Sequence, residues 1–380
     1  MTTTLVPSNS TPLERSLDLT GAGVVAGLEP AADAIAGWKI VNPQPALAPW
    51  LTYEYGLGPL SPYVPNLYDL LDDGIRWERL RGTHAGMAMG LGFVGYSAAI
   101  VDPPARRLAW ADYQLDLDRV RDGEADLVPI DGVARLSQPA RSRFRRGVHG
   151  YDVPAAEAGW TRASACILGD DSGVHLAETG DLDGPKWSFG RDYPFAITLS
   201  EAELTALGIW IPGDGSSGLR WADIQTPWAE ISQTWAELGS PGTRNAQMAQ
   251  TLAGFGAYVG FWRGDGSLIG ARRAKAFAQV GVVPAASEIF RFGGESIAPT
   301  TGGDRVYVEA LTGFGDGAGE EAAEVGILCG AHHADPAKPG ALWIDAGDLV
   351  TPQAPVARKP VSIALGQTVR ERVTFLLDFE

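Results

Sequence analysis

The last strand-like run of the sequence, TVRERVTFLLDFE at residues 368–380, constrains the fold more than any other stretch. Its side chains alternate between apolar and polar. The apolar set is Val369, Val373, Phe375, Leu377 and Phe379, and the polar set is Arg370, Arg372, Thr374 and Asp378. Because successive side chains of a strand point to opposite faces, this period of two predicts a strand that covers a core on one side.

Four more strand-like runs precede this one: DRVYVEAL, EVGILCG, ALWIDAG and PVSIALG. Glycine, proline and aspartate separate them, and these residues favour turns. Short strands joined by frequent turns are typical of an antiparallel sandwich. The sequence therefore predicts a C-terminal β-sandwich over residues 301–380.

The beginning of the sequence has a helical period instead. Thr11, Pro12 and Glu14 form a capping-box pattern with proline at the first helical position. The apolar residues that follow recur on one helix face, at Leu13, Leu17, Val24 and Leu28. The glycines within residues 21–27 each cost about 1 kcal/mol relative to alanine in a helix interior. This helix is therefore expected to be weak by itself.

More helices are predicted up to residue 96. A short, proline-interrupted helix presents Leu47, Trp50 and Leu51. A stronger one over residues 66–81 has a stripe made of Leu67, Leu70, Leu71, Ile75 and Leu80. Gly82 suits the position after that helix, and Thr83 suits the N-cap of the next. These short helices share few large residues, so residues 1–96 predict a helical segment with a thin core.

The middle of the chain is predicted to be mainly β. Residues 97–150 give a hairpin and an arginine-rich linker, and residues 151–300 give a domain with strands at 161–168, 174–178 and 257–262. Inside it Trp221, Trp228 and Trp235 recur every seven residues. Because Pro227 breaks a single helix there, the repeat predicts either one short helix or a strap over a neighbouring surface. The predicted fold class is α+β, with mainly antiparallel β modules after the helices.

Composition narrows the possible partners. The chain has 46 acidic and 30 basic side chains, and a net charge of −16 argues against nucleic acid and anionic membranes as partners.

The cysteines and the apolar stretches indicate the compartment. Cys166 and Cys329 are the two cysteines, so we expect no disulfide scaffold and we expect a reducing compartment. No secretory signal is evident in MTTTLVPSNS, and the most apolar stretch, residues 86–101, is too short and glycine-rich to span a bilayer. We expect a soluble protein.

The sequence lacks the common catalytic motifs GxxxxGK[ST], GxSxG, HExxH and paired CxxC. GFGDGAG at residues 313–319 favours a mobile hairpin loop over a phosphate site, because no helix follows it. CGAHHAD brings together Cys329, His332, His333 and Asp335, but adjacent histidines on a strand point apart, which favours an exposed loop over a metal site. DDSGVH at residues 170–175 is interpreted as a turn. We predict no catalytic residue, no cofactor and no metal.

Two clusters have both a structural and a functional interpretation. Six tryptophans fall within residues 187–262, namely Trp187, Trp210, Trp221, Trp228, Trp235 and Trp262. Core and strap packing is the first interpretation, and a platform for sugars or an interface anchor is the second. A basic cluster holds Arg141, Arg143, Arg145 and Arg146. It predicts a salt-bridged face, or else a surface that docks on an acidic neighbouring subunit.

Three stretches together resemble the phage tail protein I family, the baseplate wedge proteins of contractile-tailed phages. LVPSNSTPLERSLD at residues 5–18 resembles the family's opening run, with matches at Leu5, Pro7, Asn9, Thr11, Pro12, Leu13 and Glu14. NPQPALAPWLTYEYGL resembles its proline-rich segment, with Ala48 in place of a leucine. LRGTHAGMAMGLGFVGY resembles its Lys/Arg-Gly-Thr turn through Arg81, Gly82 and Thr83. The resemblance covers about residues 5–118, and the rest of the chain has no firm match.

The resemblance implies a structural role without catalysis. Such proteins form a wedge with two copies of a larger baseplate protein, contact the hub, spike and sheath-proximal proteins, and carry tail fibres. The first helix would then join an intersubunit bundle, which agrees with its weak, glycine-interrupted stripe. The implied location is the tail baseplate of a virion, assembled in the host cytoplasm.

The sequence thus predicts a structural virion protein, with a carbohydrate-binding adsorption protein as the alternative and a cell-wall hydrolase ranked third. The predicted partner-interface residues come from the helical segment and from the tryptophan repeat. They are Leu13, Leu17, Val24, Trp50, Trp77, Arg81, Gly82, Thr83, Trp221, Trp228 and Trp235.

Overall fold

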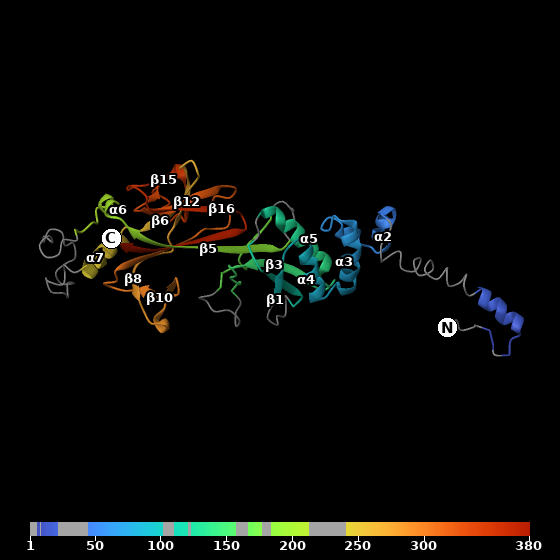
Figure 1. Cartoon of the computed structure of the whole chain (residues 1–380). Helices are drawn as coiled ribbons and strands as arrows, with labels where there is room; N and C mark the ends of the chain where they lie inside the picture. Colours follow the sequence, from blue (N-terminus) through green and yellow to red (C-terminus); the bar gives the residue numbers. More distant parts are fainter. Residues whose placement is uncertain are drawn as a thin grey trace. The chain divides into compact units, whose positions relative to one another are not determined.

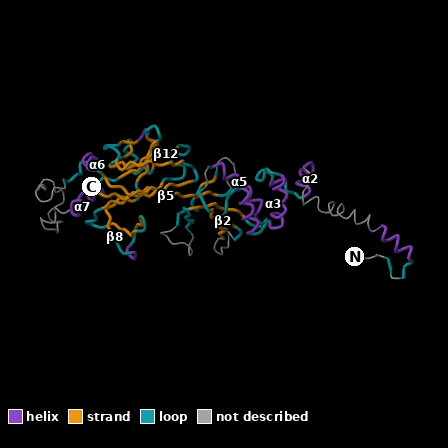
Figure 2. The backbone as a smooth tube through the Cα atoms, viewed as in Figure 1, coloured by secondary structure: helices purple, strands orange, loops and turns teal. Residues whose placement is uncertain are grey.

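The computed structural model describes residues 6–7, 9–21, 45–101, 110–120, 123–156, 166–176, 184–212 and 241–380. They form two compact units (Figure 1). Unit 1 comprises Met1–Tyr113 and Ala125–Phe144, and unit 2 comprises Gln114–Glu124 and Arg145–Glu380. The predicted α+β class is confirmed, since helices dominate the first unit and strands the second (Figure 2). Val24, Leu28 and the repeat at Trp221, Trp228 and Trp235 lie outside the described residues.

Three helices of unit 1 begin directly after a residue whose side chain caps them, namely Thr11, Asn66 and Thr83. Residues 12–21 are helical, followed by α2 (Ala48–Glu54), α3 (Leu67–Leu80), α4 (His84–Phe93) and α5 (Leu127–Ser137). The Asn66 side chain accepts a hydrogen bond from the Tyr68 N–H, and the Thr83 side chain accepts one from the Gly86 N–H. The helix predicted at residues 66–81 is thus α3, and Thr83 is the N-cap of α4.

Unit 1 has a hydrophobic core of its own, which corrects the expectation that its short helices share only a thin core. The largest buried residues of α2, α3 and the turn between them are Leu51, Leu57, Leu60, Leu70, Leu71 and Trp77. Trp77 is 2% exposed, and its indole N–H donates to the Ser137 hydroxyl of α5 over 3.0 Å. Trp77 is therefore a core residue, and its prediction as a partner-interface residue is wrong. The sequence prediction missed α5, which supplies the other side of this contact.

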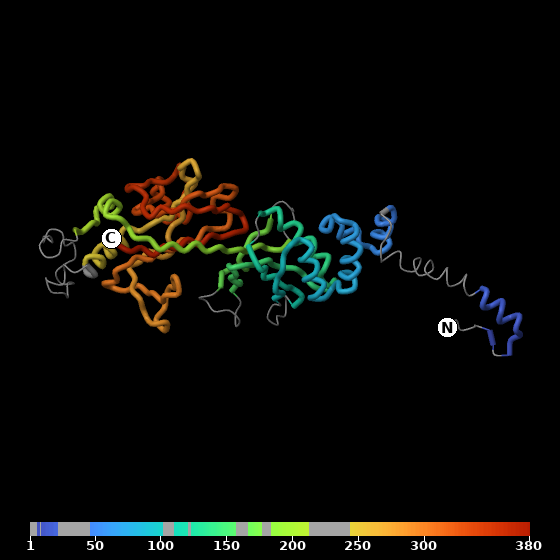
Figure 3. Tube along the Cα trace, viewed as in Figure 1, coloured from blue at the N-terminus to red at the C-terminus, as the bar shows by residue number. Residues whose placement is uncertain are grey.

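Two sheets follow the helices. The first runs from β1 (Ala98–Val101) and β2 (Asp112–Leu117) through β3 (Arg143–His149), β5 (Lys186–Leu199), β17 (Val369–Phe379), β11 (Arg305–Leu311), β8 (Ala276–Val282) and β10 (Glu295–Pro299) to β9 (Phe290–Phe292), with β4 (Val174–His175) paired to β5. β5 pairs in parallel with both β17 and β3, from partners far away in the sequence (Figure 3). The β modules were predicted to be mainly antiparallel, and β5, which was not among the predicted strands, is an exception because both of these pairings are parallel.

The second sheet, which belongs to unit 2, is antiparallel. Its order is β14 (Trp343–Asp345), β7 (Leu268–Arg273), β6 (Ala257–Trp262), β12 (Glu321–Cys329) and β16 (Val356–Ala364). β6 coincides with the strand predicted at residues 257–262, and the turn after it closes a hairpin with β7. A two-stranded ribbon joins β13 (His332–His333) to β15 (Leu349–Val350).

Both sheets share one hydrophobic core in unit 2. The predicted apolar face of β17 is confirmed, because Val373, Phe375 and Leu377 are fully buried against residues of the second sheet such as Phe261 and Ile327. The helices α6 (Glu201–Ala206) and α7 (Pro241–Ala253) add apolar side chains to the same core. The sandwich therefore includes strands from residue 186 onward, and the predicted boundary between residues 300 and 301 lies inside one packed unit.

Across the described residues, no helix is both long and apolar enough to cross a membrane.

Candidate functional site

The helix at residues 12–21 is capped at its N-terminus by the side chains of Thr11 and Glu14. Glu14 Oε2 accepts hydrogen bonds from the Thr11 N–H at 2.6 Å and the Thr11 hydroxyl at 2.9 Å. Thr11 Oγ1 in turn accepts one from the Glu14 N–H at 3.3 Å. These Thr11 donors hold the pKa of Glu14 below its usual value. The predicted capping box is confirmed.

The same helix exposes its apolar side chains. Leu13 is 70% exposed and Leu17 64% exposed, and residues four apart share one helix face. In α2, Trp50 and Tyr53 are exposed to 71% and 84%. Exposed apolar side chains that share one helix face are common at interaction surfaces. Leu13, Leu17 and Trp50 thus lie where the predicted partner interface requires them, and the interface itself stays a prediction.

The turn Arg81–Gly82–Thr83 serves the fold of unit 1. Arg81 Nε donates to the Leu136 carbonyl over 2.7 Å, and its guanidinium lies 5.4 Å from the Trp77 ring centre. Gly82 has a φ of +81°, a left-handed conformation that favours glycine, and its N–H donates to the Ser137 carbonyl. This turn therefore fastens the α3–α4 junction to the end of α5, whether or not a partner also contacts it.

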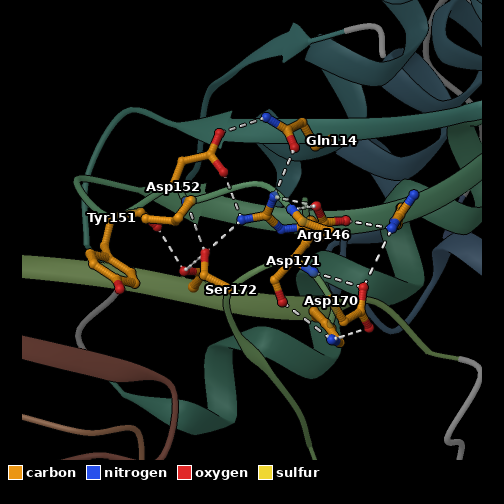
Figure 4. A network of polar contacts seen from close by, with 12 residues as sticks. Gln114, Arg146, Tyr151, Asp152, Asp170, Asp171 and Ser172 are labelled. Carbon is orange, nitrogen blue, oxygen red and sulfur yellow. Dashed lines mark hydrogen bonds and ion pairs between the residues drawn. The ribbon is translucent and has the colours of Figure 1, made fainter. Parts of the chain in front are cut away.

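The arginine cluster is divided between solvent and a buried polar network in unit 2 (Figure 4). Arg146 is 2% exposed, and its Nη2 donates to Asp152 Oδ1 over 2.7 Å and to Ser172 Oγ over 2.9 Å. Arg145 forms ion pairs with Asp170 and Asp171. For these two arginines the salt-bridged interpretation is confirmed.

The network fastens two loops to β3 and β5. Ala155 N–H donates to Asp171 Oδ1 over 2.8 Å, and the Ser188 hydroxyl of β5 donates to the Tyr151 carbonyl over 2.7 Å. Lys186 Nζ donates to Asp170, and this bond is the main reason why the pKa of Asp170 lies below its usual value. Three cations face three carboxylates here: Arg145, Arg146 and Lys186 face Asp152, Asp170 and Asp171. Three cations balance three carboxylates, and Arg146 Nη2 bonds to both Asp152 and Ser172, so the network works as a structural clasp. Arg146 Nε is buried and has no hydrogen-bond partner among the described residues.

Two loops singled out in the sequence have structural roles. Residues 313–319 connect β11 in one sheet to β12 in the other, so they are not a hairpin loop. Asp316 Oδ2 holds this loop by accepting hydrogen bonds from Arg272 Nη1 at 2.8 Å and the Gly313 N–H at 2.5 Å.

In CGAHHAD, His332 is exposed and His333 is buried, and His333 Nδ1 accepts a hydrogen bond from the Asp335 N–H. Within the described part of the chain no group of three or more candidate ligands could hold a metal ion.

The described tryptophans of the 187–262 cluster do not form a sugar platform. Trp187 and Trp262 are exposed to only 2% and 6%, and Trp210 lies under the Arg244 guanidinium at 5.1 Å. Core packing is the correct interpretation for these residues.

A cavity of about 560 Å³ in unit 1 was not foreseen from the sequence. Its lining includes His84 and Met87 of α4, Ile100 of β1, Trp110 and Asp112 around the start of β2, and Arg141. These residues extend from position 84 to position 141, and no local pattern links them. The sequence analysis named Arg141 only as a member of the basic cluster and did not single out Trp110.

The chain was compared with protein-family models and with curated proteins, and nothing in either set matches it.

Proposed function

We propose that this chain is a structural protein of a contractile phage tail baseplate, in which its N-terminal helix packs against partner subunits. The observation that carries this proposal is the exposed pair Leu13 and Leu17 on a helix with a complete capping box. Most of the stability of a helix in a protein comes from the packing of its apolar face and not from helix propensity. A helix with such a definite start and an uncovered apolar face therefore gains its stability from another surface.

The partners that we propose are those implied by the resemblance of residues 5–118 to the phage tail protein I family. They are two copies of a larger baseplate wedge protein, with hub, spike and sheath-proximal proteins and a tail fibre as further contacts. The proposed role is mechanical: unit 1 belongs to the wedge core, and the sandwich of unit 2 extends the contacts of the wedge. This role needs no catalytic residue and no cofactor, and the proposed location is the tail baseplate of the virion.

The test is co-expression of the affinity-tagged chain with the products of its neighbouring genes. We expect the wild-type chain to recover a larger partner at a ratio of one to two. The double variant Leu13→Asp, Leu17→Asp buries two charges in the shared interface, so recovery of the partner should fall at least about tenfold. Size-exclusion chromatography coupled to light scattering would measure the composition.

The matched control is Arg15→Asp, which changes the net charge by the same two units on the opposite face of the helix. It should leave the complex intact. Full recovery of the heteromeric wedge by the double variant would contradict the proposal, and so would a wild-type chain that remains monomeric with every neighbouring gene product.

A further inference from the structure

Backbone hydrogen bonds connect the segments that line the cavity of unit 1. The Gly82 N–H donates to the Ser137 carbonyl over 2.9 Å, and the Arg143 N–H donates to the Ala111 carbonyl over 2.9 Å. These bonds hold the start of α4, the loop before β3 and the start of β2 around the same space. Tyr113 is fixed as well, since its hydroxyl donates to Gln138 Oε1 over 3.0 Å and burial raises the pKa of that phenol. The cavity is thus pre-formed, as ligand sites usually are.

The lining of the cavity includes apolar side chains and an exposed indole. Met87 and Tyr113 are only 3% and 7% exposed, while Trp110, another lining residue, is 66% exposed. An indole of this kind offers a flat apolar surface together with one N–H donor. The C–H face of a pyranose ring packs well on such a surface, whereas its hydroxyls need polar partners.

The lining of the cavity also includes polar side chains. His84 offers ring nitrogens that can bond to hydroxyls. Arg141 brings a guanidinium that has no ion-pair partner among the described residues. A guanidinium matches a carboxylate through two parallel hydrogen bonds, so an acidic ligand suits this cavity better than a neutral one.

We propose that this cavity binds a hexuronic acid residue of a polysaccharide, with its ring on Trp110 and its carboxylate on Arg141. A volume of about 560 Å³ has room for more than one sugar unit. The binding does not depend on the baseplate role. It also differs from the tryptophan cluster that the sequence offered as a sugar platform, because Trp110 lies outside residues 187–262.

The test titrates the full chain with acidic oligosaccharides built on glucuronate, galacturonate or mannuronate, and with the neutral N-acetylglucosamine tetramer. Isothermal calorimetry and ligand-observed NMR would measure binding. We expect at least one uronate oligosaccharide to bind about tenfold more tightly than the neutral tetramer. The reason is that the neutral sugar has no carboxylate to form a charge-assisted hydrogen bond with Arg141. Arg141→Gln should remove this difference, and Trp110→Ala should weaken binding of the acidic sugar by about tenfold or more.

Both substituted residues are exposed, so the variants should keep the wild-type melting temperature. Arg76→Gln and Leu168→Ala, at exposed positions outside the cavity, are the matched controls and should bind normally. Absence of binding to every uronate oligosaccharide would overturn the proposal. Equal binding of acidic and neutral sugars, unchanged binding by both cavity variants, or binding only of an acidic peptide such as hexaglutamate would overturn it too.

Discussion

At the scale of single residues, Gly90 shows how packing overrides helix propensity. A Cβ atom built on Gly90 of α4 would lie 2.4 Å from Ser137 Oγ and 2.8 Å from a Val133 methyl carbon. Ser137 is also the residue that accepts the Trp77 indole hydrogen bond. The absence of a side chain at Gly90 thus lets α4 approach α5 closely enough for this buried bond to form.

We predict that Gly90→Ala destabilises unit 1 by about 1–3 kcal/mol, because overpacking outweighs the gain in helix propensity. The matched control is Gly92→Ala in the same helix, where a Cβ would meet no atom within 4 Å. That substitution should be neutral or stabilise by up to about 1 kcal/mol. Urea unfolding of both variants would measure the free energies, and equal effects of the two substitutions would contradict this account.

At the scale of elements, Glu203 joins α6 to β16. Its Oε2 accepts hydrogen bonds from the Ser200 N–H at 3.0 Å and the Ser200 hydroxyl at 2.7 Å, which completes a capping box. Its Oε1 accepts one from the Ala357 N–H at 3.0 Å. Ala357 has a φ of +54°, and it is the one described residue other than glycine with a positive φ. The carboxylate therefore supports both a helix start and an irregular strand.

The pH dependence of this contact has a definite sign. Burial raises the pKa of Glu203, but the hydrogen bonds from Ser200 and Ala357 outweigh burial and lower the pKa below the usual carboxyl value of 4.5. The ionised Glu203 carboxylate therefore stabilises the folded state above pH 4.5, and this stabilisation is lost as the pH falls through the lowered pKa. Glu203→Gln should cost about 1 kcal/mol at neutral pH and reduce the loss of stability below pH 4.5.

Thermal unfolding between pH 3 and pH 7 would measure both effects. Glu201→Gln, an exposed change in the same helix, is the control and should leave the pH profile as it is. A profile for Glu203→Gln that is parallel to that of the wild type would show that the carboxylate does not contribute in this way.

At the scale of the whole molecule, unit 2 depends on pairings between distant parts of the chain. β17 pairs with β5 over eleven positions, from Val369 opposite Phe189 to Phe379 opposite Leu199. β12 lies between β6 and β16, so strands from residues 257–262 and 356–364 flank it. Removing the part of unit 2 before residue 301 would leave one edge of β17 without β5 and one edge of β12 without β6, and it would remove Phe261 and the apolar side chains of α6 and α7 from the shared core.

We therefore predict that residues 301–380 expressed alone do not fold, although they contain five strand-like runs. Residues 145–380, which keep the second sheet and the strands of the first sheet from β5 to β9, should give a cooperative thermal transition because they retain the shared core. Circular dichroism and calorimetry would compare the two fragments. A sharp transition for residues 301–380 alone would restore the domain boundary that the sequence predicted.

The sequence determined the features that depend on near neighbours. The capping box at Thr11 and Glu14, the N-cap at Thr83 and the alternation of β17 were predicted correctly, because each depends on residues within a few positions of one another. The exposure of Leu13 and Leu17 agrees with the weak helix expected from the glycines that follow.

Only the tertiary structure decided which of these elements meet. Trp77 could be assigned to a core only after α5 had been found beside it, 60 residues further along the chain. The parallel pairing of β5 with β17 and the cavity at Trp110 and Arg141 likewise bring together residues that no local period connects. The physical reason is that helix caps and strand alternation are properties of short segments. Burial and pairing depend instead on the free energy of the whole packed unit.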